Sequence, residues 1–247
     1  MARMGGTRHL KPYAAPSFWP IPVKERPWTV KPSPGPHSAN SSIPLLLVVR
    51  DLLGYATSAR EARRIISSGL IRVDGVARKD YKFPVGPMDV IQVVPEHRFY
   101  RVIPDPTKFL KIVEVGEDEA SIKPLKIVDK TTVKGGHIQL HLMDGRNVLI
   151  RVSDPRKPVE DVYETRGTLV IKLPSQEIVD YIPLQVNNYG LIMAGRNVGK
   201  HGRIAEIRRL EKRKGGEVTL VDDKNTTLRS LIDYVLVVGR ERPLVTL

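Results

Sequence analysis

The segment Gly195-Arg196-Asn197-Val198-Gly199-Lys200-His201 is the stretch of this sequence that comes closest to a catalytic motif. In a phosphate-binding P-loop, four residues lie between the glycines, and Ser or Thr follows the lysine. Here three residues separate Gly195 from Gly199, and His201 follows Lys200. The spacing therefore argues against a nucleotide triphosphatase, and we expect no nucleotide or other cofactor.

His137 and His141 are a second candidate, because in a strand their rings would share a face, with Gln139 between them. No third ligand is spaced nearby, whereas zinc sites use three or four protein ligands. The chain has no cysteine, which excludes disulfides, thiolate zinc sites and iron–sulfur clusters. We expect solvated or hydrogen-bonded histidines and no metal.

No set of catalytic residues is predicted. Asp144 and Asp154 lie in predicted turns without a nucleophile or general base nearby, so they are interpreted as turn formers. An RNA-modifying enzyme would need a methyl-donor loop or a catalytic aspartate in a large β domain, and the sequence offers neither. The protein is therefore predicted not to be an enzyme and to have no small-molecule substrate.

Positive charge is the strongest signal in the composition. The 247 residues include 40 Lys and Arg against 27 Asp and Glu, a net charge of +13. The excess is +5 in residues 1–42, +3 in 43–98, 0 in 99–183 and +5 in 184–247. Such charge attracts polyanions, either nucleic acid or an anionic membrane. Its division predicts two or three contact surfaces beside a neutral domain.

A membrane protein is not expected. The longest apolar run, Leu45 to Val49, stops at Arg50, and a spanning helix needs roughly 18 apolar residues. Prolines interrupt the first residues, so the apolar core of a signal peptide is missing. We expect a soluble protein of the cytosol.

Residues 1–42 are rich in proline and predict an extended arm, because no helical or strand period continues through them. Aromatic residues are interleaved with its basic ones, and a disordered linker would normally be poor in such rings. They could pack on the protein itself or on bases and sugars of a nucleic acid. The aromatic residues are Tyr13, Phe18, Trp19 and Trp28, and the candidate RNA contacts are Arg3, Arg8, His9 and Lys11.

Two helices are predicted after the arm. Ser42 as N-cap and Pro44 near the first turn predict a helix that ends at Gly54, with apolar residues at helical spacing. A capping box of Ser58 and Glu61 predicts the start of a second helix, and Gly69 its end.

A hairpin and a further strand complete the same domain. Asp74-Gly75 is a dipeptide favoured in type I′ turns, and it lies between two short strands. Another strand is predicted from Met88 to Val94. These elements predict a compact α+β domain over residues 43–98.

Basic residues collect on one side of this domain. Arg60, Arg63 and Arg64 are spaced to lie on one surface of the second helix, where their charges repel. An anionic partner would explain the arrangement, and a merely solvated face is the alternative. The other candidate contacts of this domain are Arg50, Arg72, Arg78 and Lys79.

The run from Ile43 to Val94 resembles the S4-type RNA-binding domain. The resemblance rests on four segments: Arg50-Asp51-Leu52-Leu53, Ala59 through Ile66, Gly69-Leu70-Ile71-Arg72-Val73-Asp74-Gly75 and Pro84-Val85-Gly86-Pro87-Met88-Asp89-Val90-Ile91. In that family the second helix and the adjoining hairpin face structured RNA. The resemblance therefore implies that the basic residues of this helix and hairpin contact RNA.

Residues 99–183 predict a central β domain, and residues 184–247 a second β domain. The central strands are expected at 112–115, 138–142, 148–152 and 169–173, with a hairpin turn at Asp144-Gly145. Gly190 to Ile207 resembles the KOW motif of an SH3-like β-barrel, which implies RNA contacts by Arg196, Lys200, His201 and Arg203. A glycine-rich hairpin without a ligand is the alternative.

The order of these segments is similar over the full chain to the archaeal and eukaryotic ribosomal protein S4e family. The resemblance implies a multi-domain α+β fold and a structural constituent of the small ribosomal subunit that binds its ribosomal RNA and neighbouring proteins. An RNA-modifying enzyme and a factor that visits the ribosome or polymerase transiently are the alternatives.

Overall fold

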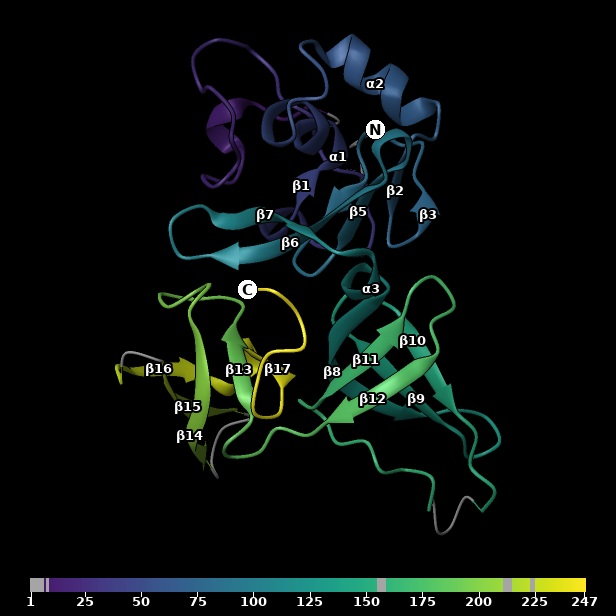
Figure 1. Ribbon diagram of the computed structural model, residues 1–247, viewed down its shortest axis with the longest axis vertical. Coiled ribbons are helices and arrows are strands. Elements are labelled where there is room, and N and C mark those ends of the chain that lie inside the picture. Colours follow the sequence, from purple (N-terminus) through teal and green to yellow (C-terminus); the bar gives the residue numbers. More distant parts are fainter. Residues whose placement is uncertain (1–6, 8, 155–158, 211–214, 223–224) are drawn as a thin grey trace, which may run out of the picture. The chain divides into compact units, whose positions relative to one another are not determined.

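The computed structural model describes residue 7 and residues 9–154, 159–210, 215–222 and 225–247. The chain divides into two compact units, Met1–Val102 and Ile103–Leu247 (Figure 1). The first unit combines short helices with short strands, and the second is mostly β. In the described residues no helix has the length and apolar character that a membrane span requires.

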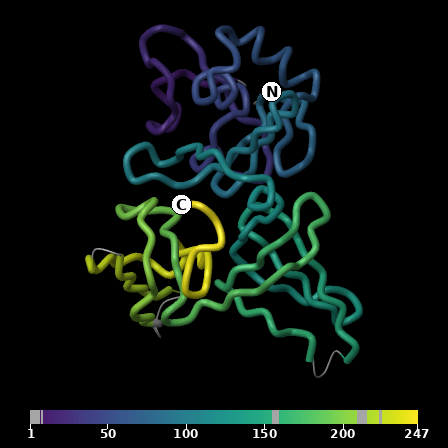
Figure 2. The backbone as a smooth tube through the Cα atoms, viewed as in Figure 1, coloured from purple at the N-terminus to yellow at the C-terminus, as the bar shows by residue number. Residues whose placement is uncertain are grey.

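The N-terminal segment folds back on itself, as the purple trace in Figure 2 shows, and is not the fully extended arm that we expected. The Thr29 N–H donates to the Leu10 carbonyl at 2.9 Å, which closes a loop around the short helix η1 (Pro12–Ala14). Trp19 is buried, and its indole N–H donates to the Ser42 carbonyl at 2.9 Å. Prolines prevent long regular elements here, but these contacts tie the segment to the first unit.

The last part of the arm is held by a buried polar contact. His37 Nε2 lies 3.0 Å from Asp89 Oδ1, and both side chains are almost fully buried. A Cβ on Gly86 would lie 2.3 Å from the imidazole ring, so glycine is needed for this packing. Because the Gly86 N–H donates to the second Asp89 oxygen at 2.9 Å, the carboxylate is satisfied on both sides.

The first helix begins later than predicted. Ile43–Pro44 forms strand β1, which pairs with β4 (Pro84–Val85), and this pairing keeps the backbone extended. Ser42 is therefore not the N-cap, which corrects our prediction. Pro44 occupies that position before α1 (Leu45–Leu47), and the chain continues into the π-helical turn η3 (Val48–Leu52). A short helix η2 (Ala39–Ser41) precedes β1.

The second helix, α2 (Ala59–Ser67), confirms the predicted caps. The Glu61 N–H donates to Ser58 Oγ at 3.2 Å, and the Glu61 carboxylate accepts from the Thr57 N–H at 2.9 Å. These bonds from Thr57 lower the pKa of Glu61. Gly69 ends the helix with φ +78°.

A type I′ hairpin, as predicted, joins β2 (Ile71–Val73) to β3 (Val76–Ala77), because Asp74 and Gly75 have φ of 53° and 77°. The strand order in this unit is β3-β2-β5-β6. Strand β6 continues past Val102 into the second unit. The remaining elements are β5 (Val90–Val93), η4 (Val94–Glu96) and β6 (Arg98–Asp105).

The second unit begins with β7 and α3 and then forms a sheet in the order β10-β9-β8-β11-β12. The four predicted strands of this region and the hairpin at Asp144-Gly145 are confirmed, whereas β8 and β12 were not predicted. The bounds are β7 (Phe109–Val115), α3 (Glu117–Ala120), β8 (Ile122–Thr132), β9 (Ile138–Leu142), β10 (Asn147–Ile150), β11 (Thr168–Lys172) and β12 (Ile178–Ile182).

The C-terminal sheet has the order β16-β15-β14-β13-β17. Its buried apolar residues form one core with Val170 and Ile182 of the preceding sheet, so the two sheets pack together. The elements are β13 (Tyr189–Ile192), β14 (His201–Leu210), β15 (Gly215–Val221), β16 (Thr227–Leu231), η5 (Ile232–Tyr234) and β17 (Val235–Gly239).

Two buried lysines of β8 explain why that strand was hard to predict. Lys123 is fully buried, and its ammonium lies 3.2 Å from Asp144 Oδ2. Lys126 Nζ donates to the carbonyls of Ile232, Asp233 and Val235, each at 2.9 Å. These bonds join the two sheets of the second unit. Burial lowers the pKa of Lys126 to about 8, although the Asp233 carboxylate partly offsets the shift.

Replacing Lys126 should destabilise the second unit. Lys126→Met leaves three carbonyls without their donor, and we expect the free energy of unfolding at neutral pH to fall by about 1–3 kcal/mol. Chemical denaturation of the variant and the wild type measures this difference. Equal stability of the two proteins would contradict the role given to the lysine.

The stabilities of wild type and Lys126→Met should also depend differently on pH. The folded pKa of Lys126, about 8, lies below its ordinary value of 10.5, so between these values the unfolded chain binds more protons. The stability that wild type has over Lys126→Met should therefore increase as the pH rises from about 8 to 10.5. A constant difference across this window would rule out the lowered pKa.

Candidate nucleic-acid interface

The outer side of α2 presents its arginines to solvent. Ala62 and Ile66 are fully buried on the inner side. Because a helix repeats every 3.6 residues, Arg60, Arg63 and Arg64 then point outward, and all three are exposed. The hairpin adds further basic side chains on exposed positions, Arg72 and Lys79. We call the set Arg60, Arg63, Arg64, Arg72, Arg78 and Lys79 the basic face.

Within the described residues, no member of the basic face forms an ion pair with a carboxylate. The nearest acidic residue of α2, Glu61, accepts hydrogen bonds from Thr57 at the start of the helix instead. Several cations of the second unit, in contrast, do pair with carboxylates. Lys130 binds Asp161, Arg166 binds Asp233 and Arg240 binds Asp180. The basic face therefore carries charge that the rest of the described chain leaves uncompensated.

Aromatic rings hold two of these guanidinium groups. Arg63 Cζ lies 4.4 Å from the ring centroid of Tyr81, and Arg78 Cζ lies 4.6 Å from that of Phe83. Such contacts orient a guanidinium without neutralising its charge. Tyr81 and Phe83 were not identified from the sequence. The available signal was two aromatic residues that follow the hairpin and flank Lys82.

Arg50 differs from the other predicted contacts of this domain. Its Nε and Nη2 each donate at 2.8 Å to the two carboxylate oxygens of Asp51, and the side chain is partly buried. The bond to Asp51 raises the pKa of Arg50. The guanidinium is already engaged, so Arg50 is less available to a ligand than the basic face.

In the arm, the described candidate contacts lie beside an exposed tryptophan. The His9 and Trp28 rings are 4.9 Å apart, and Lys11 Nζ lies 5.9 Å from the Trp28 ring. His9 and Lys11 are both exposed. Arg3 and Arg8, which were also predicted to contact RNA, lie outside the described residues.

The predicted glycine loop lies between β13 and β14. Gly195 and Gly199 have φ of +88° and +77°, and a Cβ on Gly199 would lie 2.7 Å from the backbone of Asp105. Arg196, Lys200 and Arg203 are exposed, whereas His201 is half-buried. His201 Nδ1 is 2.7 Å from the Tyr189 hydroxyl, which leaves the three flexible cations as the accessible groups.

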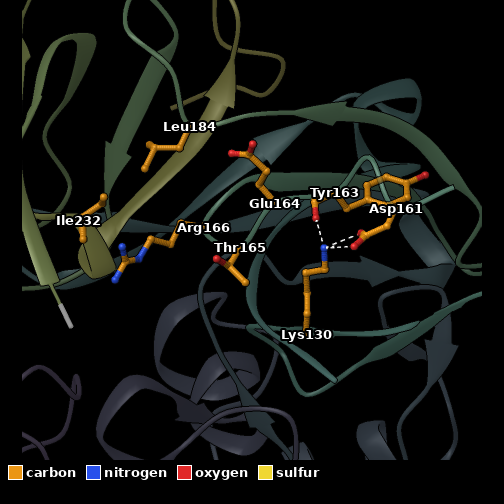
Figure 3. Close-up of a pocket in the computed structure, with 8 residues that line it drawn as sticks. All are labelled: Lys130, Asp161, Tyr163, Glu164, Thr165, Arg166, Leu184 and Ile232. Atoms are coloured by element: carbon orange, nitrogen blue, oxygen red, sulfur yellow. Dashed lines mark hydrogen bonds and ion pairs between the residues drawn. The ribbon is translucent and has the colours of Figure 1, made fainter. Parts of the chain in front are cut away.

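A pocket of 430 Å³ in the second unit was not foreseen from the sequence (Figure 3). Lys130 Nζ donates to both oxygens of Asp161 and to the Tyr163 carbonyl. Arg166 points toward a different wall and pairs with Asp233. Both cations of the pocket are thus neutralised, and a lysine held in this way is neither a free nucleophile nor an anion site.

The two histidines considered as metal ligands make ordinary hydrogen bonds. His141 lies 2.9 Å from Thr131 Oγ1 and 2.7 Å from Asn147 Oδ1 through its two ring nitrogens. His137 Nδ1 accepts from the Val152 N–H at 3.1 Å. Across the residues that the structure describes, no three metal-ligating side chains gather.

Asp144 does more than shape a turn. It is buried, with the Lys123 ammonium at 3.2 Å and Arg146 Nε at 3.3 Å from Oδ2. Its Oδ1 also accepts from the Arg146 N–H at 3.2 Å, the bond expected of a turn aspartate.

Three family models match the sequence in the order expected. One described as "RS4NT (NUC023) domain" matches residues 4–40, the S4 domain matches residues 45–91, and "Ribosomal family S4e" matches residues 96–178.

Similar proteins cover the whole chain. The small ribosomal subunit protein eS4 of Aeropyrum pernix is 54% identical over 100% of this chain and 98% of its own length. That of Methanocaldococcus jannaschii is 45% identical over the full length of both chains. The crystal structure of the 30S ribosomal protein S4e from Thermoplasma acidophilum covers 83% of this chain and 99% of its own, at 29% identity and a TM-score of 0.68.

The packing of the glycine loop can be tested by adding one methyl group. Gly199→Ala places a Cβ against Asp105 and Pro106 at positive φ, and we expect it to lower the free energy of unfolding by about 1–3 kcal/mol. Gly215→Ala in β15 is the control, because nothing lies within 4 Å of its Cβ. Chemical denaturation should separate the two, and equal stabilities would refute the close approach of the loop.

Proposed function

The chain belongs to the ribosomal protein S4e family, and from this premise we propose that it holds ribosomal RNA at three separate basic surfaces. As a member of that family, it is a structural constituent of the small ribosomal subunit and not an enzyme. It acts in the cytoplasm, within the ribosome, and supports translation. Its partners are ribosomal RNA and other ribosomal proteins.

The observation that carries the proposal is the uncompensated charge of the basic face. Like charges on one helical turn repel each other, and no described carboxylate forms an ion pair with Arg60, Arg63 or Arg64. RNA phosphates spaced along a backbone would neutralise them together. This favours the RNA-facing interpretation over a merely solvated surface.

Recognition by this face would depend on the shape and backbone of the RNA. Arginine forms paired hydrogen bonds with phosphate oxygens, and the ring contacts of Arg63 and Arg78 restrict their guanidinium groups before binding. Less side-chain entropy is then lost when RNA binds. We therefore assign Tyr81 and Phe83 a positioning role.

The arm and the glycine loop would form the other two surfaces. His9 and Lys11 are the described candidates in the arm, and those of the loop and the adjoining start of β14 are Arg196, Lys200 and Arg203. The five strands β13 to β17 around a glycine-rich loop support an SH3-like KOW domain over residues 184–247. The other proposed segments are the arm (1–42), the S4-type domain (43–98) and the central β domain (99–183).

Removing the charge of the basic face should weaken RNA binding. The Arg60→Ala, Arg63→Ala and Arg64→Ala triple variant loses up to three phosphate contacts. We expect the slope of log K against log salt concentration, for binding to small-subunit ribosomal RNA, to become less negative by about two to three. Filter binding at several salt concentrations measures this slope.

The control variant also loses three positive charges, but from arginines that are already paired with carboxylates. Arg98, Arg166 and Arg240 each contact a carboxylate, so their triple alanine variant should retain nearly the wild-type slope. An unchanged slope in the Arg60, Arg63 and Arg64 variant would mean that the face is only solvated.

The positioning role of Tyr81 predicts a loss of affinity without the change of salt slope expected for the triple arginine variant. Tyr81→Leu keeps every charge but removes the ring beside Arg63. We expect affinity for the RNA to fall about two- to fivefold while the salt slope stays constant. The same assay measures both quantities, and an affinity equal to wild type would dismiss the positioning role.

A further inference from the structure

The two tryptophans of the arm lie in opposite environments. Trp19 is 4% exposed and its indole N–H is bonded, whereas Trp28 is 51% exposed and Tyr13 is 75% exposed. Trp19 therefore completes the packing of the arm on the first unit. Covering large exposed rings of this kind with a partner is favourable, because their apolar surface is removed from water.

Trp28 and Tyr13 line one groove, which we call the arm groove. Its volume is 610 Å³, and its charged residues are Lys11, Lys24, Arg26 and Glu25. Three cations and one carboxylate give the groove a charge of +2 around the two rings. This combination of an apolar ring surface with excess cations matches a nucleotide, which has an aromatic base and an anionic phosphate.

The arm groove is ordered by the closed loop described above. Leu10 and Thr29 pair through the backbone, and they are the direct neighbours of Lys11 and Trp28. His9 lies 4.9 Å from the Trp28 ring, so residues on both sides of Leu10 contact it. Lys31 Nζ also donates to the Thr7 carbonyl at 2.5 Å. These contacts fix the backbone on either side of the groove and place His9 and Lys11 beside the Trp28 ring.

A second groove leads from Trp28 toward the basic face. It has a volume of 190 Å³ and shares Arg26 and Trp28 with the arm groove. Its other wall includes Ala59 and Arg63 of α2. RNA bound at the basic face could thus extend a strand into the arm groove without leaving the positive surface.

We propose that the arm groove binds an unpaired nucleotide of ribosomal RNA, with its base stacked on Trp28 and its phosphates near Lys11, Lys24 and Arg26. The inference rests on the proposed function and adds a preference for single-stranded RNA. Paired bases in a duplex are stacked on each other and present no free ring face, so an unpaired base is required. The excess of cations favours RNA over a neighbouring protein as the occupant.

Tryptophan fluorescence of the full chain tests the site. A short oligoadenylate should quench the emission of wild type and of Trp19→Phe, because a stacked base contacts Trp28. It should not quench Trp28→Phe, in which the buried Trp19 is the remaining fluorophore. An RNA duplex of equal length should quench much less. If Trp19→Phe does not fold, wild type and Trp28→Phe still decide the question.

Affinity gives a second readout. Trp28→Leu should weaken oligoadenylate binding about tenfold, as measured with a labelled oligonucleotide. Lys11→Met should weaken it several-fold, and Lys111→Met, an equal charge change at an exposed residue of β7, should not.

Three results would overturn the inference: no quenching by oligoadenylate, equal quenching by the duplex, or wild-type affinity in Trp28→Leu. If wild type still binds ribosomal RNA in any of these cases, the proposed function survives and the nucleotide site does not. If Trp28→Leu keeps oligoadenylate affinity but is washed from small subunits at lower salt, the groove instead receives a protein. Failure of wild type to bind ribosomal RNA at all would refute the proposed function.

Discussion

The structure depends on which lysines and arginines have a carboxylate partner within the chain and which do not. In the second unit, described cations such as Lys123, Lys130 and Arg166 bind carboxylates of the same unit. On α2 and its hairpin, carboxylate partners are missing among the described residues, and aromatic rings orient two guanidinium groups without reducing their charge. The first arrangement stabilises a fold, and the second preserves charge for an anionic partner.

The central β region, which has no net charge, packs against the C-terminal sheet. Lys126 places an ammonium against three carbonyls at the end of η5, and the two sheets also share apolar residues. A buried ammonium is costly unless its hydrogen bonds are complete. The glycine loop is therefore presented by a two-sheet unit that is held by both apolar and polar contacts.

Local signals predicted the first unit well but missed its long-range contacts. The capping box at Ser58 and the turn at Asp74-Gly75 depend on neighbours in sequence, so both were predicted correctly. Ser42 failed as a cap because β1 pairs with β4, some 40 residues away. Strand β8 was not predicted, and its buried lysines are satisfied by distant groups that the local sequence does not reveal. The basic residues of the candidate site were named from the sequence. The contacts of Tyr81 and Phe83 with two of the arginines were found only in the structure.

Arginine reactivity tests the central claim most directly. Modification of the free protein and of assembled small subunits with an arginine-specific dicarbonyl, read by mass spectrometry, compares each guanidinium in the two states. We expect Arg60, Arg63, Arg64 and Arg72 to react in the free protein and to be protected in the subunit. Equal reactivity of these arginines in both states would contradict the account, because their charge would then face solvent in the ribosome.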